Sequence, residues 1–321
     1  MFGGTMQRLL RVLLLITCLV APGAHAETPL PAKQQLLWDR LRSDIGDVER
    51  RLDGVIGIAI LDLNTGAELL LHADEVFPQA SSIKIAVLAE LYHQAEQTAH
   101  GVGGKASLTN LYTVRAADLV PDSAVLGGMT PGITVLTNRD LATIMVAVSD
   151  NSATNVLIDR VGMDNVRRLT DGLGLSHTQL RRKMMDLKAA GEGRENISTP
   201  REMMQLLERL YRGKVIAPPL LDDFFTVLAT PKDSWLPRNL PEDLRIANKP
   251  GALEGVRNDS GIVFLGNRPY VICVMTTFLA SERAGEDAIS RISALTYSVF
   301  DRLARASEYG RVISPSNGSV R

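Results

Sequence analysis

Strand-like segments lie near both ends of this 321-residue chain, and a long stretch of helical character separates them. Apolar runs bounded by turn residues predict strands. The expected strands are residues 55–63, 67–72, 245–249, 260–265 and 270–278. Turn sequences join neighbouring pairs at Asn64-Thr65-Gly66 and at residues 266–269. This order predicts one antiparallel sheet built from both chain ends, with a helical subdomain inserted between them.

Helical periodicity accounts for the rest of the domain. Residues 33–52 and 285–304 each carry apolar residues along one helical face. The chain is therefore expected to be an α+β protein. Its α/β part would comprise about residues 33–75 and 213–305, and its helical part about residues 76–212.

Three short motifs occur in order along the chain. They are Ser81-Ser82-Ile83-Lys84, Ser149-Asp150-Asn151 and Lys249-Pro250-Gly251. Average residue usage predicts about one S-x-x-K and about one K-x-G by chance in a chain of this length, but far fewer S-D-N triplets. Their joint occurrence therefore indicates one active site rather than three coincidences.

The first motif has the spacing that nucleophilic catalysis needs. Residues three apart, such as Ser81 and Lys84, lie on one helical face. A serine hydroxyl becomes a nucleophile when a base takes its proton, and a lysine is such a base if burial and a nearby positive charge lower its pKa. Lys249 would supply that charge if it faces Lys84. The alternative, a helix-capping Ser81 with a solvated Lys84, explains this motif alone but not all three.

The three motifs resemble the active site of the serine β-lactamases and penicillin-binding proteins, which form an acyl-enzyme on the first serine. Other segments are similar to class A members of that family. These segments are residues 77–80, 118–125, 149–155 and 198–200. The resemblance covers most of residues 54–305 and implies a β-lactamase/transpeptidase-like fold.

The resemblance implies a role for each motif residue. Ser81 would be the nucleophile, Lys84 its proton acceptor, and Ser149 the relay of a proton to the leaving nitrogen. Asn151 would bind the amide carbonyl of the substrate, and Lys249 would attract its carboxylate.

Backbone groups would complete the site. The N–H groups of Ser81 and Ala252 would form the oxyanion hole, because backbone donors are fixed before charge develops. Gly251 would lie beside them in the substrate-binding strand. Asp150 is expected to be structural, as the cap of a helix that begins near Ser152.

The third motif departs from the family pattern. Pro250 replaces a threonine or serine whose hydroxyl holds the substrate carboxylate, and it also lacks an N–H. Arg257 is a candidate substitute, because a guanidinium binds a carboxylate through two parallel hydrogen bonds. The alternative is a solvated arginine at the end of a strand.

A second departure concerns deacylation. Counting back from Ser198-Thr199-Pro200 places Lys183 where class A enzymes carry the glutamate that activates water, and Leu187 where they carry an asparagine. A lysine there is no carboxylate base. Asp186, or Glu192 and Glu195 further along the chain, could enter the site if the loop is built differently.

The N-terminus has the pattern of a secretory signal peptide over residues 1–26, with an Ala24-His25-Ala26 cleavage site. Its apolar core is too short to span a membrane. A lipoprotein reading through Cys18 fits poorly. The catalytic domain would then be residues 27–309, followed by a disordered tail at 310–321. We therefore expect an exported, periplasmic or secreted protein without stable membrane insertion.

Composition excludes other classes. The net charge of -1 and the lack of a basic run argue against nucleic-acid binding. The five histidines have no metal-ligand spacing, so neither a metal nor a cofactor is expected. Cys273 remains alone after signal removal and is expected to be a buried small residue. The expected partner is a small molecule, a β-lactam or a D-Ala-D-Ala-like peptide, bound by a monomer.

Three functions remain open at this point. The first is a class A-type serine β-lactamase whose deacylation is slow. The second is a DD-peptidase, or another serine amidase or esterase, that acts on peptidoglycan-like substrates. The third is a penicillin-binding protein or sensor with low turnover.

Overall fold

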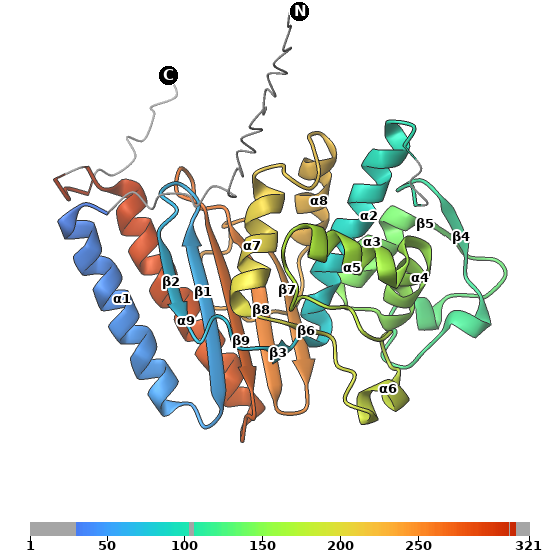
Figure 1. The fold of residues 1–321 in the computed structure, drawn as a ribbon, viewed down its shortest axis with the longest axis horizontal. Coiled ribbons are helices and arrows are strands. Elements are labelled where there is room, and N and C mark those ends of the chain that lie inside the picture. The colour runs from blue at the N-terminus through green and yellow to red at the C-terminus, as the bar shows by residue number, and fades with distance from the viewer. Residues whose placement is uncertain (1–29, 103–105, 308, 313–321) are drawn as a thin grey trace, which may run out of the picture.

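One five-stranded antiparallel sheet forms the centre of the computed structural model, which describes residues 30–102, 106–307 and 309–312 (Figure 1). The strand order is β2-β1-β9-β8-β7. The bounds are Val55–Asp62 (β1), Glu68–Leu71 (β2), Ile246–Leu253 (β7), Val256–Val263 (β8) and Tyr270–Thr277 (β9). The sheet therefore joins both ends of the chain, as the sequence predicts.

The two faces of the sheet support two separate cores. Along β1, Ile58 and Ile60 pack with helices α1 (Ala32–Arg51) and α9 (Glu282–Arg305), which lie side by side on one face. Ala59 and Leu61 face the other way, toward the helical part. This alternation follows from the pleat of a strand. The predicted helices 33–52 and 285–304 are confirmed within a few residues.

The helical part surrounds α2 (Lys84–Ala99), which is buried on all sides over its first turns. Its other helices are α3 (Asn138–Ala147), α4 (Asn151–Val161), α5 (Met163–Gly172), α6 (Leu187–Gly191), α7 (Pro200–Tyr211) and α8 (Leu220–Leu228). Two small sheets pair β3 (Phe77–Pro78) with β6 (Ile197–Ser198) and β4 (Leu111–Thr113) with β5 (Val135–Thr137). Short 3-10 helices span Ala80–Ile83 (η1), Ala116–Asp118 (η2) and Leu126–Gly128 (η3). The insertion of this part between the sheet strands agrees with the predicted α+β fold.

The third motif lies inside a β-hairpin that was not predicted at full length. The sequence pattern ended one strand at residue 249 and began the next at 260, whereas β7 and β8 continue to a turn at Glu254-Gly255. Pro250 and two glycines weaken the strand signal there. β7 is an edge strand, so one side of its backbone needs no ladder partner and tolerates proline.

The predicted signal peptide lies outside the described residues, as does most of the predicted tail. Residues 310–312 of that tail are described, and Val312 forms an isolated bridge with Ala306. Within the described part of the chain, no helix combines the length and apolarity needed to cross a membrane. Cys273 is buried, as expected.

Candidate active site

Ser81 lies in η1, directly before α2, at the border between the sheet and the helical part. Ala80 before it adopts a left-handed backbone conformation, with φ of 50°. No side-chain capping bond is made at the start of η1 or α2. The helix-cap interpretation of Ser81 is therefore wrong, and its hydroxyl is left for other contacts.

The first turn of α2 places Lys84 beside the second motif. Lys84 is fully buried, and its Nζ donates to Ser149 Oγ at 3.0 Å, to the Ser149 carbonyl at 2.6 Å and to Asn151 Oδ1 at 3.1 Å. Ser149 Oγ in turn donates to Ser81 Oγ at 2.9 Å. Two hydroxyls and one amine thus form a continuous hydrogen-bonded chain.

The second motif is held in place by Asp150. Its carboxylate is buried and accepts hydrogen bonds from the backbone N–H groups of Ala153, Val125 and Leu126, each at 2.9 Å. Asp150 is the N-cap of α4, which confirms its expected structural role. Ser149 immediately before it has φ of 57°, so the turn stores backbone strain at the site.

The third motif brings a second ammonium to the same hydroxyl. Lys249, in β7, is buried and donates from Nζ to Ser149 Oγ at 3.0 Å and to the Pro250 carbonyl at 3.1 Å. The Ser82 hydroxyl donates to the Lys249 carbonyl at 3.0 Å, which ties β7 to η1. The structure therefore brings together Ser81, Lys84, Ser149, Asn151 and Lys249, which we call the lysine–serine cluster.

Close contact between β7 and η1 explains the glycine of the motif. A Cβ at Gly251 would lie 2.6 Å from the Gln79 carbonyl oxygen and 2.8 Å from Ser82 N. Only glycine fits this approach. Backbone N–H groups alternate sides along a strand, so Ala252 directs its N–H to the same free edge as the nitrogen of Pro250.

Burial sets the charge of the two lysines. Burial lowers the pKa of Lys84 well below its ordinary value, and the charge of Lys249 lowers it further, while Asp150 opposes the shift. Burial also lowers the pKa of Lys249 to about 7, with Lys232 adding to the shift and Asp259 opposing it. Both effects favour the neutral amine of Lys84, which is the form that accepts a proton.

Arg257 does not face the lysine–serine cluster. This corrects the prediction that Arg257 replaces the hydroxyl that is missing at Pro250. It pairs with Ala252 in the ladder between β7 and β8. The neighbouring Asn258 donates to the Pro78 carbonyl at 2.7 Å, on the side of the site. Successive side chains of a strand point to opposite faces, so Arg257 points toward α9.

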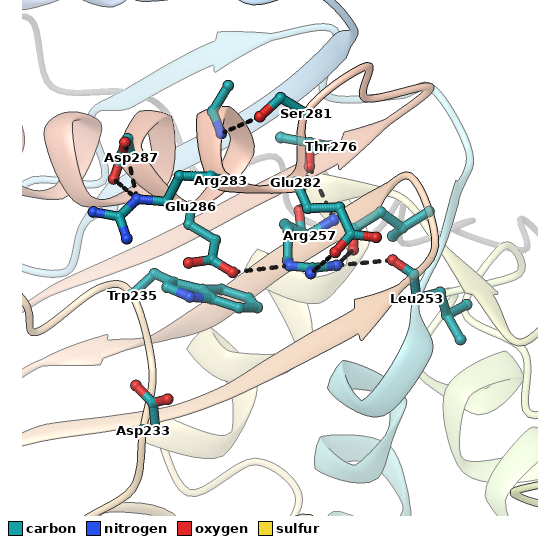
Figure 2. Close-up of polar contacts among 12 residues, drawn as sticks. Asp233, Trp235, Leu253, Arg257, Thr276, Ser281, Glu282, Arg283, Glu286 and Asp287 are labelled. Carbon is teal, nitrogen blue, oxygen red and sulfur yellow. Dashed lines mark hydrogen bonds and ion pairs between the residues drawn. The ribbon is translucent and has the colours of Figure 1, made fainter.

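The contacts of Arg257 use its donors on that far face (Figure 2). Its Nη1 donates to the carbonyls of Leu253 and Val256 at 2.8 and 2.9 Å. Its other nitrogens bind Glu282 and Glu286, and its guanidinium lies over the ring of Trp235 (Figure 2). The alternative of a solvated arginine is wrong too, because 11% of the side chain is exposed.

The loop between α5 and α7 is attached to α4 through Met184. Asn155 of α4 donates to the Met184 carbonyl at 3.0 Å and accepts from its N–H at 2.8 Å. Lys183 forms an ion pair with Asp159 at 2.5 Å. Asn151, Asn155 and Asp159 are spaced by four residues on one face of α4. Met184 is therefore bound about one helical turn from Asn151, and Lys183 is bound about two turns from it.

Each acidic side chain of this loop is bound elsewhere. Asp186 accepts from the N–H of Ala189 at 3.0 Å and caps α6. The other two pair with arginines, Glu192 with Arg194 at 2.5 Å and Glu195 with Arg182 at 2.8 Å. Neither Lys183 nor Asp186 contacts the lysine–serine cluster, so the loop directs no carboxylate at it.

Two supporting features were missed from the sequence. The Asn155–Met184 attachment has no motif of its own. The carboxylate of Asp259 is buried behind β7 and accepts from Asn248 Nδ2 at 2.8 Å and from two backbone N–H groups at 3.0 Å. Nothing in a strand-like sequence reveals such a buried acid. Among the residues that the structure describes, no three His, Cys, Asp or Glu side chains form a metal-binding group.

A buried amine with a lowered pKa, linked through one hydroxyl to a second, defines a serine hydrolase that works through an acyl-enzyme. The chain belongs to the β-lactamase enzyme family, whose family model matches residues 40–300. Its fold is that of the class A β-lactamases.

Similar proteins include β-lactamases and a penicillin-acylated protein. The chain is 29% identical over 281 residues to a carbapenem-hydrolyzing β-lactamase KPC of Klebsiella oxytoca, with 84% of this chain and 89% of that protein covered. A solved β-lactamase of Sphaerobacter thermophilus is 29% identical with a TM-score of 0.73, covering 82% and 97%. A mutant of PBP-A, solved as an acyl-enzyme complex with penicillin G, is 26% identical with a TM-score of 0.72, covering 82% and 97%.

Proposed function

We propose that this protein is a serine β-lactamase-type hydrolase that opens the β-lactam amide through an acyl-enzyme on Ser81. The observation that carries the proposal is the hydrogen-bonded chain from Ser81 through Ser149 to Lys84. Family membership and the names of the relatives support it.

In the acylation step, Ser81 Oγ attacks the carbonyl carbon of the lactam, and its proton passes through Ser149 Oγ to the neutral amine of Lys84. The N–H groups of Ser81 and Ala252 hold the oxyanion. The proton then returns through Ser149 to the lactam nitrogen as the C–N bond breaks. Asn151 binds the side-chain amide of the substrate, and the charge of Lys249 attracts its carboxylate.

Deacylation is the slow step of this proposal. Water must attack the acyl carbonyl, and no carboxylate of the loop between α5 and α7 is directed there. The neutral amine of Lys84, acting through Ser149, is the base that remains. The proton gained from Ser81 has passed on to the lactam nitrogen, so the amine of Lys84 is neutral again in the acyl-enzyme, but it acts on the water only through Ser149 and not directly.

The missing carboxylate also favours a second candidate function. A penicillin-binding protein or DD-peptidase uses the same acylation groups and accumulates its acyl-enzyme with β-lactams. A D-Ala-D-Ala-containing peptide distinguishes the two candidates, since a DD-peptidase releases D-alanine from it and a β-lactamase does not.

One experiment tests the proposal directly. The purified protein is mixed with a chromogenic β-lactam, and hydrolysis and intact mass are followed together. We expect a burst of one equivalent, an adduct on the peptide that holds Ser81, and slow continued turnover. Ser81→Ala should remove both adduct and burst. An adduct that persists in Ser81→Ala, or that maps to Ser82, would contradict the assignment.

We further propose that the protein acts in the periplasm or outside the cell, after cleavage behind Ala26. The support is the charged start, apolar core and Ala24-His25-Ala26 site of the N-terminal sequence. N-terminal sequencing of the exported form should begin at Glu27. A mature chain that starts with a lipid-bearing Cys18 would contradict this processing site.

A further inference from the structure

A hollow on the helical part is lined by none of the residues of the lysine–serine cluster. It has a volume of about 730 Å³. We call it the arginine groove. Its lining residues are Gly162, Met163, Asp164, Asn165, Arg167, Arg168, Gln179, Leu180, Arg181 and Arg194. Its lining residues come from the first part of α5 and from both ends of the loop that carries α6. Figure 1 locates these elements in the fold.

The charge of the arginine groove is strongly one-sided. Four arginines and one aspartate line it, a net charge of +3, or +2 when Glu192, the partner of Arg194, is included. Asp164 pairs with Arg167 at 3.2 Å. Among the described residues, the Arg181 side chain forms no hydrogen bond or ion pair. Arg168 donates to the side chain of Asn165, and its charge acts on the carboxylate of Glu90. The arginine groove therefore keeps an excess of positive charge, and Arg181 has no ion-pair partner among the described residues.

The groove sits at the neck of the loop. Arg182 and Glu195 close this neck with an ion pair at 2.8 Å, and the Arg182 side chain is only 10% exposed. Arg181 and Arg194 flank that pair on the surface and carry like charges. Both line the arginine groove, so a bound anion would be attracted by both sides of the neck.

We propose that the arginine groove is a binding site for a phosphate-bearing anion with more than one negative charge. Guanidinium groups match phosphate oxygens through paired, charge-assisted hydrogen bonds. The hollow is larger than one phosphate group needs, so a ligand with two linked phosphates is favoured. Such a ligand connects α5 to both ends of the loop and holds the neck closed.

Pyrophosphate is the probe for the test. The purified protein is titrated at constant ionic strength, with thermal unfolding and calorimetry as readouts. We expect a saturable rise in Tm and a binding constant at least about tenfold weaker in the double variant Arg181→Gln/Arg194→Gln, which loses two charged partners. The matched control is Arg283→Gln/Arg291→Gln, at two exposed positions of α9, which should bind as the parent does.

Hydrogen exchange locates the site. Bound pyrophosphate should protect backbone amides in residues 179–182 and 194–197. If the groove variant does not fold, Arg181→Lys/Arg194→Lys keeps the charge without the paired geometry and should bind more weakly than the parent. Equal binding by the groove and control variants, or protection elsewhere in the chain, overturns the proposal.

The source of the phosphate is a separate outcome. Saturable binding of pyrophosphate without binding to phosphatidylglycerol vesicles identifies a free ligand. Binding to those vesicles, but not to phosphatidylcholine vesicles, and its loss in the groove variant identify a lipid headgroup. Binding to neither probe overturns the proposal. None of these readouts depends on hydrolysis, so their failure leaves the proposed β-lactamase activity untouched.

Discussion

Lys84 and Lys249 direct their ε-amino groups at a single oxygen, Ser149 Oγ, each at 3.0 Å. Both side chains are buried, and two like charges so close cannot both be held at low cost. Burial and the charge of Lys249 both lower the pKa of Lys84, which favours the neutral form of Lys84. The pair thereby separates two tasks, with a base at Lys84 and a positive charge at Lys249.

This division predicts a pH dependence for substrates that carry a carboxylate. The pKa of Lys249 is about 7, so its charged fraction falls from about 90% at pH 6 to about 10% at pH 8. Since the charged form attracts the carboxylate, kcat/KM should fall across this range. Lys249→Arg stays charged over the whole range and should lose the fall, as measured by stopped-flow acylation. An unchanged fall in Lys249→Arg would assign it to another group.

The same shift has a consequence for stability. The pKa of Lys249 in the folded protein is about 7, below the ordinary lysine value of 10.5, so as the pH falls the unfolded chain binds this proton before the folded protein does. Stability should therefore decrease as the pH falls from about 10 to 7, with no further loss from this group below 7. Lys249→Met, which cannot titrate, is the control for this slope in chemical denaturation.

Ser149 combines a catalytic hydroxyl with a strained backbone, and two substitutions separate these properties. Both Ser149→Ala and Ser149→Gly remove the proton relay and should slow acylation by about 10²–10⁴-fold. With φ at 57°, only glycine relieves the strain, so Ser149→Gly should be more stable than Ser149→Ala by about 1 kcal/mol. Burst kinetics and urea unfolding measure the two effects. Equal stability of the two variants would count against strain at this residue.

Local patterns in the sequence were enough for the outer parts of the fold. The apolar stripes of α1 and α9 identify their buried faces, because each helix packs one side on the sheet. The β7–β8 hairpin was shortened in the prediction because Pro250 and Gly251 carry strand-breaking signals. Their tolerance depends on the edge position of β7, which is a property of the assembled sheet.

The site was predictable where motif residues act and not where geometry decides. The residues Ser81, Lys84, Ser149 and Lys249 converge as the family resemblance implies. The direction of Arg257 depends on strand register, and one residue in either direction reverses the face that a side chain occupies. The placement of Met184 rather than Lys183 against α4 likewise depends on a loop conformation that spacing alone does not determine.

Arg257 is expected to support the hairpin without discriminating between substrates. It binds two hairpin carbonyls on one side and two glutamates of α9 on the other, across the ladder from Ala252 (Figure 2). Arg257→Gln should lower stability by about 2 kcal/mol. It should also lower kcat/KM by the same factor for a carboxylate-bearing β-lactam and for its neutral ester.

A matched control separates the effect of losing the hairpin contacts of Arg257 from the effect of losing an ion pair with Glu286. Arg238→Gln removes an arginine that also pairs with Glu286, at 3.1 Å, but that contacts no hairpin carbonyl. It should leave both kcat/KM values near those of the parent. If Arg257→Gln lowered kcat/KM only for the carboxylate-bearing β-lactam, Arg257 would bind the substrate carboxylate after all.

The last prediction concerns the slow step, and it depends on which loop residue lies nearest the acylated serine. Lys183 is paired with Asp159, about two helical turns along α4 from Asn151, whereas Met184 is fastened to Asn155, about one turn away. A glutamate at 183 would face Asp159 and be repelled by it. A glutamate at 184 would start closer to the acyl carbonyl.

We therefore expect Met184→Glu to raise the steady-state rate after the burst, and Lys183→Glu to leave it unchanged. Met184→Gln is the control, because it alters the same buried position without adding a base. The rate of loss of the acyl adduct, followed by intact mass, measures the step directly. Faster deacylation in Lys183→Glu than in Met184→Glu would show that the loop rearranges when the acyl-enzyme forms.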